Sequence, residues 1–82
     1  MERFVRITSP ADQSIVPSRV IVRGVASPGT LVRVNGVEAD TRPEGDFVAV
    51  VALERGPNLL RATVIDAAGT VVYTDIRVYY FP

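Results

Sequence analysis

The stretch GPNLLRATVIDAAGT, residues 56–70, decides the fold class because its residue types alternate with a period of two. The alternating set is Asn58, Leu60, Ala62, Val64 and Asp66. Apolar residues at every second position are the pattern of a half-buried β-strand, and a turn containing Gly69 follows. The sequence therefore predicts a strand over residues 58–66, entered through a turn at Gly56 and Pro57.

Short alternating runs of the same kind recur along the chain between glycines and prolines, without a helical period. Six further strands are predicted, over residues 3–8, 19–25, 30–35, 37–40, 46–53 and 71–81. Asn35-Gly36 is the strongest hairpin signal, because a type I′ turn needs positive φ at both central positions. Strands that are apolar on one face pack as two sheets, face to face.

The predicted fold is thus all-β, a sandwich of about seven antiparallel strands in two sheets whose terminal strands leave from opposite ends. The side chains predicted to form the core are Val20, Val22, Val32, Val34, Phe47, Val51, Leu53, Leu60, Val64 and Val78. Further inward positions are Val5, Ile7, Ala49, Val72, Ile76 and Tyr80.

Composition excludes most catalytic chemistry. A chain of 82 residues predicts one domain spanning 1–82, which we expect to be a module of a longer multidomain protein. The chain has no cysteine and no histidine, and all nine basic residues are arginine, so thiol, imidazole and lysine nucleophiles or bases are missing. We expect no enzyme activity and no cofactor.

Charge and hydropathy exclude two classes of partner. The formal net charge is zero, whereas nucleic-acid binding needs a basic surface. No apolar run of about 18 residues exists, so membrane insertion is not expected.

Several short motifs carry a resemblance to a known family. They are Ser9-Pro10 after the first strand, V-x-V-x-G at Val20, Val22 and Gly24, V-x-V-N-G at Val32 to Gly36, G-x-F at Gly45 and Phe47, and G-x-N-x-L-x-A-x-V-x-D-x-A-G over residues 56–69. Together they resemble bacterial immunoglobulin-like domains. The similar type occurs as an accessory domain of glucodextranase-like enzymes and as repeats in bacterial cell-surface proteins. Where relatives often carry Asn after the last glycine, this chain has Thr70, so we expect only Gly69 at positive φ.

The resemblance covers Ile7 to Tyr80 and implies an immunoglobulin-like fold. It also implies a role as a non-catalytic structural, spacer or protein-interaction module of a larger secreted or cell-surface bacterial protein. The partners would be neighbouring domains of the same chain, with a protein or polysaccharide ligand as a further option. A secreted or cell-envelope location is inferred from the resemblance alone.

A carbohydrate-binding accessory domain of a glycoside hydrolase is one alternative. Its candidates are the aromatic residues Phe4, Tyr73, Tyr79, Tyr80 and Phe81. Tyr73 and Tyr79 share a face of the last strand, but a separation of about 20 Å is too long for one monosaccharide. Packing against a neighbouring domain is the simpler interpretation.

Acidic residues suggest two other sites. Asp66 and Asp75 are candidate ligands of a calcium-dependent adhesion domain, although calcium takes six to eight oxygens. Two of the three carboxylates of Asp40, Glu44 and Asp46 could act as the acid and base of glycoside hydrolysis. We expect no deep pocket there and favour a solvated turn.

Several apolar side chains are predicted to point away from the core. Ile21, Val48 and Val50 should form one outer patch if residues 19–25 and 46–53 share a sheet. Leu59 and Ile65 lie on the back of the 58–66 strand. A contiguous patch can mark an interface, so we expect Ile21, Val48 and Val50 to contact a neighbouring domain or to support weak self-association.

Overall fold

The computed structural model describes residues 3–82, which form eight strands. They are β1 (Val5–Ser9), β2 (Arg19–Ala26), β3 (Leu31–Val34), β4 (Val37–Glu38), β5 (Asp40–Thr41), β6 (Asp46–Ala52), β7 (Gly56–Ile65) and β8 (Val71–Tyr80). Residues 3–82 contain no helix that is long and apolar enough to cross a membrane.

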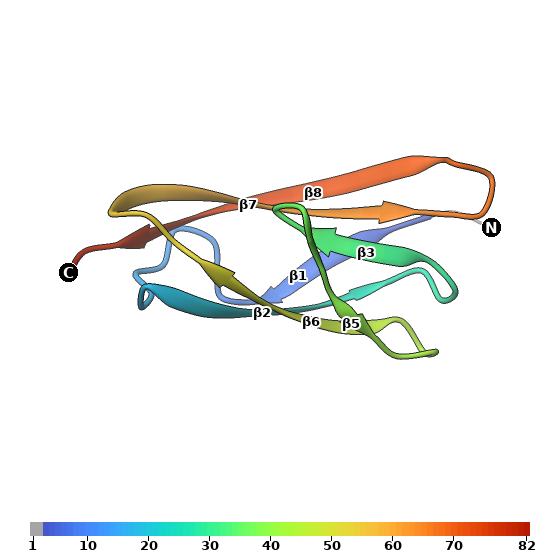
Figure 1. The fold of residues 1–82 in the computed structure, drawn as a ribbon, viewed down its shortest axis with the longest axis horizontal. Coiled ribbons are helices and arrows are strands. Elements are labelled where there is room, and N and C mark those ends of the chain that lie inside the picture. The colour runs from blue at the N-terminus through green and yellow to red at the C-terminus, as the bar shows by residue number, and fades with distance from the viewer. Residues whose placement is uncertain (1–2) are drawn as a thin grey trace.

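The strands form two antiparallel sheets packed face to face (Figure 1). Sheet A has the order β1-β2-β6-β5, and sheet B has the order β4-β3-β7-β8. This is the strand order of an immunoglobulin constant-type sandwich with one short strand added at the edge of the second sheet. The predicted fold class, an all-β immunoglobulin-like sandwich, is confirmed.

Two boundaries differ from the sequence prediction. The expected strand over 37–40 is two strands in different sheets, because the buried Ala39 lies between them and donates its N–H to Val32 O at 3.0 Å. Gly56 and Pro57 are not an entry turn but the first pairs of β7, opposite Tyr80 and Tyr79. The turn lies earlier, and Asn58 holds it by bonding the N–H and carbonyl of Glu54.

The core lies between the sheets and follows the predicted alternation. The buried apolar residues are Val20, Val22, Ala26, Val32, Val34, Ala39, Phe47, Ala49, Val51, Leu60, Ala62, Val64 and Val78. Every residue predicted for the core is among them except Leu53, which is partly buried and packs against the same cluster, as do Val5, Ile7, Val72 and Ile76. The inward register predicted for residues 3–8, 19–25, 30–35, 46–53, 58–66 and 71–78 is therefore correct. Tyr80, also predicted to point inward, is half-buried and does not belong to this cluster.

Backbone conformation at the turns also agrees with the residue types. Asn35 and Gly36 have φ of 50° and 81°, as the type I′ turn requires. In the turn after β7, Gly69 has φ of 84° and Thr70 stays outside the positive region.

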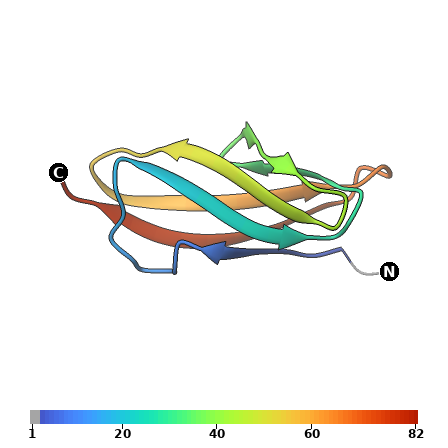
Figure 2. The ribbon, with the colours of Figure 1, turned by 90° about the horizontal axis from the view of Figure 1, so that it is seen from below.

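The molecule is a short rod, measuring 41 × 18 × 18 Å along its principal axes. The chain enters near one end of the long axis and leaves at the other, as predicted (Figure 2). After β1, residues 12–16 run along the second half of β8, where Ile15 pairs with Tyr79 in parallel. We call residues 12–16 the edge segment.

Candidate functional site

The outer face of sheet A carries the predicted apolar patch. Because β2 and β6 pair in this sheet, Ile21 lies directly opposite Val50, and both are about half exposed, at 50% and 53%. Val48 lies two residues before Val50 in β6, opposite Arg23, and is half-buried. The placement of the patch is confirmed; its contact with a partner stays a prediction.

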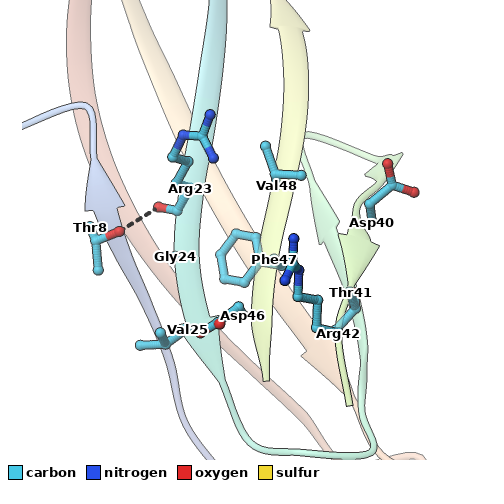
Figure 3. A pocket seen from close by; sticks show the side chains of 10 residues that line it. All are labelled: Thr8, Arg23, Gly24, Val25, Asp40, Thr41, Arg42, Asp46, Phe47 and Val48. Carbon is cyan, nitrogen blue, oxygen red and sulfur yellow. Dashed lines mark hydrogen bonds between the residues drawn. The ribbon is translucent and has the colours of Figure 1, made fainter. Parts of the chain in front are cut away.

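A depression of about 590 Å³ adjoins this patch (Figure 3). It lies over the central strands β2 and β6 of sheet A. On one side is β1, whose register shifts between Ile7 and Ser9, and on the other side is the two-residue strand β5. At the shift, Thr8 Oγ1 donates to the carbonyl of Arg23 at 3.2 Å. We expected no deep pocket here, because a sandwich of 82 residues has little room for one, and the depression is open. The register shift beside it is not visible in the alternation of either strand.

The depression is lined by charges of both signs. Arg23 and Arg42 supply positive charge, and Asp40 and Asp46 supply negative charge, while Glu44 stays outside on the exposed turn. All four lining side chains are exposed to solvent. A catalytic acid for glycoside hydrolysis needs a desolvated setting, so the arrangement suits contact with a polar surface better than acid–base chemistry.

Asp66 organises the turn between β7 and β8. Its Oδ1 accepts the N–H groups of Ala68 at 3.0 Å and Thr70 at 2.8 Å, and its Oδ2 pairs with Arg3 Nε at 2.9 Å. The N–H of Thr70, together with Arg3 and the N–H of Ala68, lowers the pKa of this carboxyl against the opposing effect of its burial. Asp66 therefore shapes the strand end.

Asp75 is held by a different arginine. Arg61 lies opposite Asp75 across β7 and β8 and binds both of its oxygens, through Nε at 2.8 Å and a terminal nitrogen at 3.0 Å. The hydrogen bond from Arg61 lowers the pKa of Asp75. The two carboxylates are not brought together, because Asp66 lies beyond the last pair of the hairpin, Ile65 with Val71. Within residues 3–82, no group of three or more acidic side chains is placed so that it could hold a metal ion.

The two candidate tyrosines lie in separate surroundings. Arg61 also covers one face of Tyr73, with its guanidinium carbon 4.2 Å from the ring centroid. Tyr79 stacks on Phe81 with centroids 6.0 Å apart, and its hydroxyl donates to Gln13 Oε1 at 2.8 Å. Of the other rings, Phe4 is exposed and Tyr80 is half-buried. Tyr79 thus contacts Phe81 and the edge segment, whereas Tyr73 contacts Arg61, so the two tyrosines do not form one site.

Sequence reasoning missed the cluster of Arg61, Tyr73 and Asp75 on the outer face of sheet B. The signal was present, since a hairpin closed at residues 66–70 places residue 61 opposite residue 75. A cation stacked on a ring and bonded to a carboxylate is a stable surface arrangement. It engages Tyr73, one of the two tyrosines of the carbohydrate interpretation, and Asp75, one of the two carboxylates of the calcium interpretation.

The comparisons with known proteins give the fold and no family. No family model and no curated protein matches the chain. Among solved structures, the chain is similar to CopC from Methylosinus trichosporium OB3b, with a TM-score of 0.65 and 14% identity over 99% of this chain and 95% of CopC. The chain has neither His nor Cys, the imidazole and thiolate ligands that transition metals favour. At this identity the likeness establishes a shared β-sandwich and carries no site residues across.

Proposed function

We propose that this chain is a non-catalytic module that spaces and connects neighbouring domains of a longer secreted or cell-surface protein. One observation carries the proposal: the chain enters at one end of a 41 Å rod and leaves at the other. Domains joined in series through such a module are held apart by its full length.

The surface supports the same proposal. The depression on sheet A is open and lined by exposed charges. On sheet B, Arg61 and Asp75 form an ion pair with each other. The resemblance to bacterial immunoglobulin-like repeats and accessory domains favours a location outside the cytoplasm.

Small-angle scattering on two copies joined directly, residue 82 to residue 1, tests the spacer role. A spacer predicts a maximum dimension about twice the 41 Å of one copy. The control joins two copies through a glycine–serine linker of about 20 residues, which samples many separations. If the direct fusion is as compact as two domains lying side by side, the spacer role is rejected.

The carbohydrate alternative draws less support from the contacts. Tyr73 offers only one open face, and the ring of Tyr79 is stacked on Phe81. Retention on insoluble polysaccharide in a pull-down, lost in Tyr73→Ala or Tyr79→Ala, would nevertheless establish it.

The calcium alternative is tested by chelation. Asp66 and Asp75 each neutralise an arginine, so we expect the melting temperature to be the same with calcium and with EDTA. A ligand specific to the folded state must raise the melting temperature. An increase with calcium that is lost in Asp66→Asn would support an adhesion role instead.

A further inference from the structure

The edges of the two sheets are protected unequally. An exposed strand edge offers unpaired N–H and C=O groups to other chains, and proteins protect such edges by shortness, irregularity, charge or cover. β4 and β5 have two residues each, and β1 has five with a register shift. β8 is different, since it has ten residues that pair with β7 without a shift.

The edge segment covers the second half of β8. Gln13 N–H donates to Arg77 O, Tyr79 N–H donates to Ser14 O, and Val16 N–H donates to Tyr79 O, at 2.6 to 2.9 Å. Asp12 Oδ1 accepts the N–H of Arg77 at 2.8 Å. The peptide groups of residues 77 and 79 therefore face the free edge of sheet B and are satisfied there.

Within residues 3–82, no segment is hydrogen-bonded to the edge of the first half of β8, although β1 of sheet A packs close to β8. Because the ladder is regular, the peptide groups of Val71, Tyr73 and Asp75 face the same edge as those of residues 77 and 79. Within residues 3–82, no hydrogen bond reaches these three edge-facing groups. Val71 and Tyr73 are each 56% exposed, and residues 71–75 contain neither proline nor lysine. The only charge, Asp75, is bonded to Arg61.

We propose that residues 71–75 of β8 pair with the same residues of a second copy, antiparallel, about a two-fold axis at Tyr73. In this register Val71 meets the partner's Asp75, and Tyr73 meets the partner's Tyr73. Every edge-facing peptide group of residues 71–75 then has a partner, as required of a hydrogen-bonded antiparallel pair. The two four-stranded sheets B become one continuous sheet of eight strands.

Charge and cover select this register over its neighbours. A pairing centred on Asp75 would place two carboxylates opposite each other, which is destabilising. It would also need the edge of Arg77, which the edge segment occupies. The formal net charge of the chain is zero, so no overall repulsion opposes a second copy. About a two-fold axis the same three edge-facing residues satisfy each other, so a second copy supplies a complete partner for this edge.

Sedimentation and hydrogen exchange of the protein test the pairing directly. The mass should rise from 8.9 kDa toward twice that value as the concentration increases to about 1 mM, where an association of only about 4 kcal/mol is detectable. The amides of Tyr73 and Asp75 should become protected with concentration, whereas Val72 and Thr74, which face β7, should be protected throughout. A monomer at every concentration overturns the proposal.

A charge-swap pair tests the two-fold axis at Tyr73. Tyr73→Lys places two like charges opposite each other, and so does Tyr73→Glu, so each variant alone should stay monomeric. An equimolar mixture should dimerise, because lysine then faces glutamate. Failure of the mixture to associate, with both variants folded, would reject this register.

Leu59→Lys and Leu59→Glu are the matched controls. Leu59 is 46% exposed on the outer face of the same sheet, but it lies on the interior strand β7. Both variants should dimerise like the parent protein. Loss of the dimer in these controls would overturn the proposal, because the interface would then include the outer face of β7. Loss of the dimer in Val50→Glu on sheet A, with dimers retained by both Tyr73 variants, would overturn it as well.

Discussion

Gly24 shows how one residue sets the packing of sheet A. It lies on β2 opposite Phe47 of β6, on the inward face between Val22 and Ala26. A Cβ atom built there would collide with the ring of Phe47 and with the carbonyl oxygen of Arg6. The carbonyl of Arg6 and the aromatic ring together fill the space that a side chain at residue 24 would need, which explains the glycine of the V-x-V-x-G pattern.

Gly24→Ala should therefore lower the free energy of unfolding by about 1–3 kcal/mol, the usual cost of overpacking. Urea denaturation measures the change. In a Phe47→Leu background the same substitution should cost less, because the collision with the ring is gone and only the collision with the Arg6 carbonyl remains. Equal costs in both backgrounds would show that the ring does not exclude the methyl group.

The Asp66 carboxyl should make stability depend on acid pH. Its pKa is lowered in the folded state, mainly by the N–H of Thr70 and also by Arg3. It therefore stabilises the fold above the unfolded pKa of about 3.9, and this contribution disappears as the pH falls through the lower folded value. Asp66→Asn cannot titrate at this position, so its melting temperature should lie below that of the parent at pH 7, and the gap should close as the pH falls through the folded pKa of Asp66. A gap independent of pH would contradict this role.

At the scale of the element, adjacent residues of β7 lie on opposite faces of sheet B, one in the core and one at the surface. Leu60 is fully buried between the sheets, and Leu59 points to the outer face. Leu60→Ala should lower the free energy of unfolding by about 2–5 kcal/mol, because it leaves a cavity. Leu59→Ala is the matched control and should change it by less than about 0.5 kcal/mol. Similar melting of the two variants would mean that the register of β7 is wrong.

Strands could be predicted from the sequence because alternation reports directly on burial. The positions of Leu60, Phe47 and Val32 followed from a period of two. The division of residues 37–40 could not be predicted, since Ala39 is buried in either arrangement and only tertiary packing decides which sheet receives Asp40. The depression on sheet A also depends on register between strands, which the alternation of one strand does not determine.

The outer-face contacts were partly predictable. The patch of Ile21, Val48 and Val50 followed from assigning two strands to one sheet. The bond between Arg61 and Asp75 needed the register of the β7–β8 hairpin, which the turn residues imply. From the sequence we expected Ile15 and Val16 to touch a sheet edge, and they do. The strand that they meet could not be foreseen, because the bonds to β8 join residues more than sixty positions apart.

At the scale of the whole molecule, the edge segment has a mechanical consequence. It runs parallel to β8, yet it is tied to the opposite end of the rod through β1. Tension applied at the two ends would therefore slide the edge segment and β8 past each other. Their hydrogen bonds would resist as a group rather than open one at a time.

Single-molecule pulling measures this resistance. Traction between the first and last residues should give a higher rupture force than traction that peels β8 from β7. Val16→Pro removes the N–H that bonds Tyr79 O and should lower the end-to-end force, which depends on the unfolding rate. A module built in this way would stay folded up to a higher force when the domains on either side of it are pulled apart.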